Sequence, residues 1–307
     1  MTASIAVVGS LNTDLVVRSP RIPRPGETIL GGELHTVPGG KGANQAVAAA
    51  RLGARVSMIG RVGQDTFAAP ILENLAADGI DHAFVQQDGE FATGVALIVV
   101  DDNGENSIVV SSGANMHLSP ADVEAAEAAI TAADLLVLQL EVPLETVIRA
   151  AELARAHGVK VVLNPAPAQP LPASLLSMID VLVPNETEAA LLTDLPTGAQ
   201  AGAAEAVEAL LGSGVGTVIL TLGARGALPA RQGKMQIVPA FDVEPVDTTA
   251  AGDAFVAGLS VALAEGRELY EAVRWGNAAG ALAATKLGAQ TSLPTRQALE
   301  RLLSGGR

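Results

Sequence analysis

The chain has 307 residues, of which 49% are apolar, and it carries a formal net charge of −14. This length allows one large domain with a sizeable core or two smaller domains, and an acidic balance without any basic stripe excludes nucleic acid as an expected partner. Cysteine is absent, which excludes disulfides, thiolate metal sites and a cysteine nucleophile and agrees with a reducing cytoplasm.

The N-terminal residues predict a strand. The run SIAVVGS (4–10) is short and apolar, and neither the basic region nor the long apolar stretch of a secretion signal accompanies it. No apolar run in the sequence reaches the ~18 residues needed to span a bilayer. We therefore expect a cytoplasmic protein without a membrane partner.

Helical and strand patterns then alternate along the chain. Helices are predicted over 44–54, 65–79, 119–133, 143–158 and 200–214, and continuous apolar strands over 55–63, 134–140, 159–165, 180–185 and 216–223. Continuous apolar strands separated by helices are typical of a parallel sheet that is buried on both faces. The sequence therefore predicts a single α/β domain over residues 1–307, with a mostly parallel central sheet and helices on both faces.

Two regions break this alternation. Residues 14–37 and 92–112 each contain strand-like runs with no helix between them, and DDNGEN (101–106) is a strong hairpin signal. We expect the two regions to form a small β-sheet that projects from the main domain. The pattern alone leaves open whether this sheet is an ordinary edge or a lid over an active site.

Common nucleotide-binding and metal-binding motifs are missing. GGKGAN (39–44) lacks the serine or threonine that follows the lysine of a Walker A loop, and GSGVG (212–216) precedes a strand instead of following one, unlike a dinucleotide fingerprint. The four histidines are scattered along the chain, so a histidine metal site is not expected.

The segment DTTAAGDAF (247–255) carries the strongest chemical signal. Ala250, Ala251 and Gly252 place no bulky side chain at the predicted start of a helix, where unpaired N–H groups and the helix dipole attract anions. Gly252 also permits an unusual backbone conformation. Asp253, which follows, could cap the helix. Alternatively, it could accept the proton of a hydroxyl group that attacks a phosphate bound beside it.

Further polar residues follow predicted strands or open predicted helices. Because the carboxyl ends of parallel strands meet at one edge of a sheet, where open α/β sheets bind ligands, we expect these residues to gather there. They are Asn12 and Asp14 after the first strand, Lys41 and Asn44 in a glycine-rich turn, Glu141, Asn185 and Glu188 after later strands, and the glycine-bounded turn 221–226.

Together these motifs resemble the ribokinase-like family of carbohydrate kinases. The similarity runs nearly end to end, through VVGSLNTD, PGET, GGKGANQAVAAARLGA, TGVALI, LNPAPA, PNETEA, TLGARG, VDTTAAGDAF and KLGAQTSLP. The pair GGKGANQA and DTTAAGD is the most specific part, and it favours the members that phosphorylate D-ribose. Ala250 stands where many relatives have glycine, and we expect the anion site to survive this change.

The resemblance implies transfer of the γ-phosphoryl group of ATP to the 5-hydroxyl of D-ribose. Asp253 would be the base, and the N–H groups of 250–252 would stabilise charge on the transferred group. The sugar would contact Asn12, Thr13, Asp14, Gly40, Lys41, Gly42, Ala43, Asn44, Glu141 and Asp253. The nucleotide would contact Asn185, Thr221, Leu222, Gly223, Ala224, Arg225, Gly226, Gly252 and Asn277.

The same resemblance implies two metal ions and a lid. Glu188 would help to place Mg²⁺ through water, and a monovalent cation, usually K⁺, would lie beside the anion site. The positions that match the K⁺ site are Asp247, Thr249, Ala283, Lys286, Gly288 and Ser292. Strand pairs near 11–37 and 93–111 match the family's β lid, which implies a homodimer through that lid.

Other activities stay open at this stage. Kinases of 2-deoxyribose, fructose, a nucleoside or a sugar phosphate share the fold, and a sugar-binding sensor without catalysis is a further alternative. The scarcity of aromatic residues fits a bare sugar better than a nucleoside, and no cation besides Lys41 stands near the predicted sugar pocket for a sugar phosphate. The intact Asp253 and the NxxE pattern (185–188) favour a kinase over a sensor.

Overall fold

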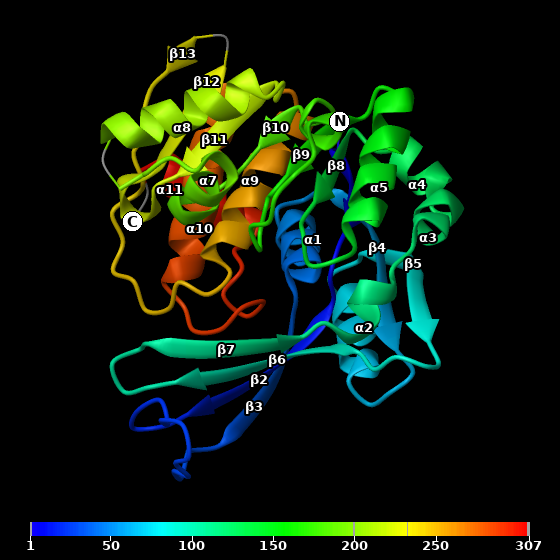
Figure 1. Cartoon of the computed structure of the whole chain (residues 1–307), viewed down its shortest axis with the longest axis vertical. Coiled ribbons are helices and arrows are strands. Elements are labelled where there is room, and N and C mark those ends of the chain that lie inside the picture. The colour runs from blue at the N-terminus through cyan, green and yellow to red at the C-terminus, as the bar shows by residue number, and fades with distance from the viewer. Residues whose placement is uncertain (1, 199, 232, 306–307) are drawn as a thin grey trace.

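The computed structural model describes residues 2–198, 200–231 and 233–305, which form two β-sheets and their covering helices (Figure 1). The larger sheet consists of β1 (Ser4–Val8), β4 (Arg55–Gly63), β5 (Asp81–Asp88), β8 (Leu135–Leu138), β9 (Lys160–Leu163), β10 (Val181–Leu182), β11 (Thr217–Thr221), β12 (Ala227–Arg231) and β13 (Lys234–Met235). Their spatial order is β13-β12-β11-β10-β9-β8-β1-β4-β5. Every pairing from β5 to β11 is parallel, and β12 and β13 add antiparallel.

Helices connect the parallel strands and cover both faces of this sheet. They are α1 (Lys41–Arg51), α2 (Ala68–Ala77), α3 (Pro120–Ala125), α4 (Glu127–Thr131), α5 (Leu144–Ala156), α6 (Ala173–Leu176), α7 (Glu186–Thr193), α8 (Gln200–Gly212), α9 (Ala251–Ala264), α10 (Leu269–Ala284) and α11 (Arg296–Leu303). Two short 3₁₀ turns, Gly113–His117 and Gly223–Arg225, complete the list. None of the helices within the described ranges is long and apolar enough to cross a membrane.

The central strand β1 shows why both faces of the sheet are buried. Ile5 and Val7 belong to a core shared with α1, α2, α9, α10 and α11, whereas Ala6 and Val8 belong to a core shared with α3, α5 and α8. Successive side chains of a strand point to opposite faces, so a continuous apolar run fits a sheet covered on both sides. The predicted fold class is therefore confirmed.

The second sheet contains the two regions that break the alternation. It consists of β2 (Asn12–Arg18), β3 (Leu34–Gly39), β6 (Gly94–Val100) and β7 (Asn106–Ser111), in the order β3-β2-β6-β7. β6 and β7 form the predicted antiparallel hairpin, and β2 pairs with β6 in parallel. This four-stranded sheet projects from the layered body on one side (Figure 1). Its β2 begins at Asn12, so the sheet starts among the predicted sugar-binding residues.

Several elements differ from the sequence prediction. The edge strand β5 was not predicted because exposed polar residues interrupt it, as its mixed burial pattern shows. The β12–β13 hairpin was also missed, since Pro229 lies within β12 and proline argues against a strand. The helix predicted over 119–133 divides into α3 and α4 at Ala126, whose backbone is not helical (φ −94°, ψ 8°).

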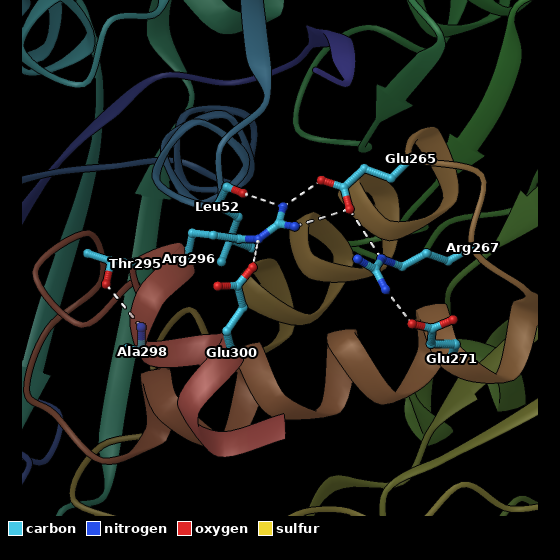
Figure 2. A network of polar contacts seen from close by, with 8 residues as sticks. All are labelled: Leu52, Glu265, Arg267, Glu271, Thr295, Arg296, Ala298 and Glu300. Carbon is cyan, nitrogen blue, oxygen red and sulfur yellow. Dashed lines mark hydrogen bonds and ion pairs between the residues drawn. The ribbon is translucent and has the colours of Figure 1, made fainter. Parts of the chain in front are cut away.

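The C-terminal helix α11 is tied to the body through Arg296. Its guanidinium donates hydrogen bonds to Glu265 at the end of α9, to Glu300 one turn further on, and to the carbonyl of Leu52 after α1 (Figure 2). The guanidinium carbon also lies 4.4 Å from the centroid of the buried Trp275 ring. One half-buried side chain therefore joins three helix ends.

Replacing Arg296 with methionine is expected to lower the free energy of unfolding by about 1–3 kcal/mol, because Glu265 then loses a partner and the Leu52 carbonyl loses its donor. Denaturant unfolding of both proteins measures this change. Arg301→Met, an exposed position on the same helix, is the control and should change stability by less than about 0.5 kcal/mol. Equal losses from both variants would contradict the role given to Arg296.

Candidate active site

The first turn of α9 presents backbone N–H groups that the protein leaves free. Within the described residues, no protein acceptor binds the N–H groups of Ala250, Gly252 and Asp253, whereas the N–H of Ala251 donates to the carbonyl of Thr248 at 3.1 Å. The free set therefore differs from the predicted one at Ala251, which closes a turn, and it gains Asp253. Free N–H groups at a helix start form an anion-binding site.

The unusual backbone at this turn belongs to Ala250. Its φ of 58° is left-handed, a conformation that costs a residue with a Cβ about 1–2 kcal/mol. Gly252, which permits such a conformation, is instead helical. A Cβ at Gly252 would meet no atom within 4 Å. Glycine at 252 therefore leaves the space in front of the helix open.

Asp253 lies in this turn but does not cap its own helix. The side chain is buried, with 6% exposure. Its Oδ2 accepts a hydrogen bond from Asn44 Nδ2 at 2.9 Å, and its Oδ1 accepts one from Gln45 Nε2 at 3.0 Å. No N–H of α9 among the described residues donates to the carboxylate. This geometry argues against the capping alternative, and it leaves carboxylate lone pairs for a ligand.

The glycine-rich turn before α1 packs directly against the chain that follows β1. Gly40 has a φ of 89°, and a Cβ there would lie 2.8 Å from the backbone nitrogen of Asn12. A Cβ at Gly39 would lie 2.3 Å from a carboxylate oxygen of Asp14. These glycines therefore bring the start of α1 against Asn12 and Asp14, as the sequence analysis expected of the sugar-binding set.

The Asp14 carboxylate is buried without a hydrogen-bond donor among the described residues. It is 7% exposed. Burial, and then the negative charges of Glu141 and Asp253, raises the pKa of Asp14 to about 7. A buried carboxylate without a donor costs stability. Such a carboxylate can accept hydrogen bonds from a ligand, as predicted for Asp14.

Two neighbouring groups are held in place by residues that the sequence analysis missed. Glu141 accepts hydrogen bonds from the hydroxyl of Ser10 and from the backbone nitrogen of Lys41, the latter at 3.0 Å. The Oδ1 of Asn12 accepts a hydrogen bond from Asn115 Nδ2 at 2.7 Å, and Asn115 is 1% exposed. Ser10 and Asn115 therefore orient the predicted sugar-binding side chains from behind.

Lys41 is the one cationic side chain that the sequence predicts beside the sugar pocket. Its side chain lines a cavity of about 210 Å³ together with Glu188, Ala250, Gly252 and Asp253. The charge of Asp253 raises the pKa of Lys41 against the effect of burial, and Glu141 and Glu188 add to the rise. The ammonium group therefore stays charged beside the free N–H groups, where a phosphate would meet both.

Asn185 and Glu188 form a capping box at the start of α7. Glu188 accepts hydrogen bonds from the backbone nitrogen and the side-chain nitrogen of Asn185 at 2.8 and 2.9 Å, and its own N–H donates back at 2.8 Å. Burial raises the pKa of Glu188. Each carboxylate oxygen accepts one hydrogen bond and therefore keeps a lone pair. Glu188 also lines the cavity, which fits a water-mediated contact to Mg²⁺. Across the described residues, no group of three or more His, Asp or Glu side chains could hold a metal directly.

A groove of about 660 Å³ continues from this cavity, and the two share Asn185, Thr221, Thr248 and Gly252. Of the residues predicted to contact the nucleotide, the groove is lined by Asn185, Thr221, Gly223, Ala224, Gly226, Gly252 and Asn277. Two predicted residues do not line it. Leu222 packs in the core, and the side chain of Arg225 pairs with Glu186.

The segments predicted to hold K⁺ meet behind α9. Asp247 Oδ1 accepts hydrogen bonds from Thr249, and Oδ2 accepts one from the N–H of Gly288 at 2.8 Å. Burial opposes ionisation, but these hydrogen bonds outweigh it and lower the pKa of Asp247. Ser292, four residues after Gly288, is buried, whereas Lys286 is exposed. Ala283 is buried, and its carbonyl accepts a hydrogen bond from the N–H of Lys286 at 3.2 Å. Carboxylate and backbone oxygens are the donors that a hard cation such as K⁺ prefers.

Three buried amides behind Asp253 were not predicted as site residues: Gln45, Gln139 and Asn164. A signal for them exists in the sequence. Gln45 stands in an alanine-rich helix, and Gln139 and Asn164 end two otherwise apolar strands. A polar residue at a position whose neighbours are all buried needs a hydrogen-bond partner.

Comparison with known proteins identifies the family. A family model described as pfkB family carbohydrate kinase matches residues 2–296. The chain belongs to the pfkB family of carbohydrate kinases. This pfkB kinase is 47% identical to the ribokinase of Haemophilus influenzae over 297 aligned residues, and the alignment covers 97% of each chain. It is 39% identical over 301 residues to the deoxyribokinase of Salmonella typhi, with 98% of each covered.

Solved structures agree with this family assignment. The pfkB kinase is similar to Arabidopsis thaliana ribokinase complexed with ribose and ATP, with a TM-score of 0.91, 35% identity and 99% of each chain covered. It is also similar to the Thermotoga maritima ribokinase, with a TM-score of 0.88 and 37% identity over 98% of this chain and 99% of that one. The predicted resemblance is therefore confirmed.

Proposed function

We propose that this pfkB kinase transfers the γ-phosphoryl group of ATP to the 5-hydroxyl of D-ribose, which gives D-ribose 5-phosphate and ADP. The observation that carries the proposal is the place of Asp253. It lines the cavity with the free N–H groups and accepts a hydrogen bond from Asn44, a predicted sugar-binding residue. The predicted nucleotide groove shares four residues with the same cavity. The ribokinases that resemble the chain over nearly its full length support ribose as the substrate.

In the proposed reaction, Asp253 accepts the proton of the 5-hydroxyl as its oxygen bonds to the γ-phosphorus. The bond from phosphorus to the β,γ-bridging oxygen breaks, and ADP leaves. The free N–H groups of Ala250 and Gly252 and the ammonium of Lys41 stabilise charge on the transferred group. Bound Mg²⁺ would neutralise phosphate charge, with Glu188 reaching it through water, and K⁺ behind α9 would strengthen the positive field.

The proposed sugar site combines fixed acceptors and donors. Asp14 and Glu141 would accept hydrogen bonds from ribose hydroxyls, and Asn12 would take part beside them. Asn44 adds an acceptor, because its buried Oδ1 has no partner among the described residues. Several fixed polar groups reject sugars that lack a matching hydroxyl.

The four-stranded sheet is proposed to act as a lid over the sugar and to form a homodimer contact. Its β3, β6 and β7 expose large apolar side chains, namely Leu34, Leu97, Ile108, Val109 and Val110. Exposed apolar patches of this kind mark interaction surfaces. A cytoplasmic location is part of the same proposal, since ATP and a reducing environment are available there.

A coupled ADP-release assay tests this function over ribose, 2-deoxyribose, fructose and nucleosides, each with and without K⁺. Ribose is expected to give the highest kcat/KM, and K⁺ is expected to raise the rate. A nucleoside as the best substrate would overturn the proposed sugar. The same rate with Na⁺, K⁺ or neither would overturn the monovalent site.

2-Deoxyribose is the second candidate substrate. The observation that favours this sugar is the 39% identity to a deoxyribokinase. 2-Deoxyribose differs from ribose by the loss of a single hydroxyl. A site that binds this hydroxyl through buried polar groups discriminates strongly against its loss. The ratio of kcat/KM for the two sugars in the same assay decides between them.

A further inference from the structure

A chain of three buried side-chain amides ends on the carboxylate of Asp253. Gln45 Nε2 donates to Asp253 Oδ1 at 3.0 Å and to Asn164 Oδ1 at 3.2 Å. Gln45 Oε1 in turn accepts a hydrogen bond from Gln139 Nε2 at 2.7 Å. Gln45 and Gln139 are 1% and 0% exposed. Both hydrogens of the Gln45 amide are therefore used, one of them on Asp253.

The orientation of the Gln45 amide is fixed from two sides. Asn164 Nδ2 donates to the carbonyl of Val183 at 3.0 Å, so Asn164 must present its oxygen to Gln45. An ionised Asp253 also presents only acceptors. If the Gln45 amide turned over, its oxygen would face both of these oxygens. The donor therefore has one stable place, pointing at Asp253.

At the far end of this chain of amides, the side chain of Gln139 packs against the backbone at Gly9, directly after β1. A Cβ at Gly9 would lie 2.0 Å from Gln139 Oε1, so Gln139 fills the space that glycine leaves at the end of β1. Gln45 is thus held between a central strand and Asp253. Motion of its side chain would break three hydrogen bonds within the core.

We infer that Gln45, supported by Gln139 and Asn164, is a positioning residue that aims the carboxylate of Asp253 at the sugar hydroxyl. This inference rests on the proposed function of Asp253. Asn44 and Gln45, adjacent in α1, each hold one carboxylate oxygen, so together they fix both side-chain torsions. With Asn44 alone, the carboxylate can rotate towards the ammonium of Lys41, which lines the same cavity.

Gln45→Met keeps the length of the side chain and removes both amide donors. It is expected to lower kcat by about 10–100-fold, because a misplacement of about 1 Å can cost that much. The dissociation constants of sugar and ATP, measured by calorimetry, are expected to change by less than about threefold. The orientation of Asp253 matters for proton transfer in the transition state and contributes little to binding in the ground state. Loss of kcat without loss of binding distinguishes positioning from a purely structural role.

Gln45→Glu adds a readout that packing alone does not predict. At about pH 6 part of the introduced carboxyl group is protonated and can donate to Asp253, whereas at about pH 8 it is ionised and repels it. The ratio of variant to wild-type kcat is expected to fall across this range. A ratio that does not change with pH would contradict the inference.

The matched control is Thr146→Val, which removes the hydrogen bond from a fully buried hydroxyl to the carbonyl of Leu118, and neither residue lines the cavity or the groove. It is expected to lower the melting temperature but not kcat. All assays use the sugar that gives the highest kcat/KM in the substrate panel. An error in the proposed substrate is therefore detected by the panel and does not affect the test of Gln45. Wild-type kcat in Gln45→Met at full folding would overturn the inference.

Discussion

Asp253→Asn is expected to reduce kcat by about 10²–10⁴-fold, the range that a positioned general base contributes. Asn44 and Gln45 both donate to the carboxylate, and an asparagine side chain has one oxygen for these two donors. The amide nitrogen then faces a donor, and no group remains to take the proton of the hydroxyl. Transfer slows because the nucleophile stays protonated.

Binding is expected to survive this change. The free N–H groups of α9 and the other proposed sugar-binding residues remain, so the dissociation constants measured by calorimetry should change by less than about tenfold. Ser260→Ala is the control on the same helix, since it removes a fully buried hydroxyl without a partner in the described residues. It should leave kcat unchanged. Near wild-type turnover of Asp253→Asn would show that another group is the base.

The sequence predicted those parts of the site that depend on short, local patterns. Small residues before an aspartate at a helix start predicted the free N–H groups at the start of α9. Strand ends predicted where Asp14 and Glu141 gather, because parallel strands end at one edge. The alternation of apolar strands with helices predicted the fold class. Such patterns lie within single segments, so they can be recognised without knowing which other segments pack against them.

Contacts between distant segments could not be predicted in this way. Gln45 and Asp253 are far apart in the chain, and only packing of α1 against α9 places one on the other. Similarly, the left-handed backbone falls on Ala250 and not on Gly252, because the turn closed by Thr248 and Ala251 sets the torsions. Local composition shows that a special conformation is possible, whereas tertiary contacts decide which residue adopts it.

Asp14→Asn is expected to stabilise the fold while it weakens sugar binding. The pKa of Asp14 is about 7 in the folded protein and close to 3.8 when the chain is unfolded. Between these values the folded state binds the extra proton, so the free energy of unfolding of the wild type falls as pH rises from about 4 to about 7. Above about pH 7 the full cost is present, about 4 kcal/mol at most.

The asparagine variant lacks this titration, so its advantage in stability should be small near pH 4 and greatest above about pH 7. Denaturant unfolding of both proteins at about pH 5 and about pH 8 measures the difference, and it isolates Asp14 from other groups such as Glu188 that titrate in both proteins. Asp102→Asn, an exposed position between β6 and β7, should change nothing. A variant that is less stable at the higher pH would contradict the raised pKa.

Sugar binding should respond in the opposite direction. In the absence of sugar, Asp14 lacks a donor among the described residues, so its ionised form gains most from ribose hydroxyls. Wild-type affinity for ribose is therefore expected to rise with pH through about 7 and then level off, whereas the affinity of Asp14→Asn should be independent of pH and about 10–100-fold weaker above that value. A variant that is both more stable and equally tight in binding would mean that ribose does not contact Asp14. A gain in stability paired with a loss of affinity would show that the buried carboxylate is kept for the ligand at the expense of the fold.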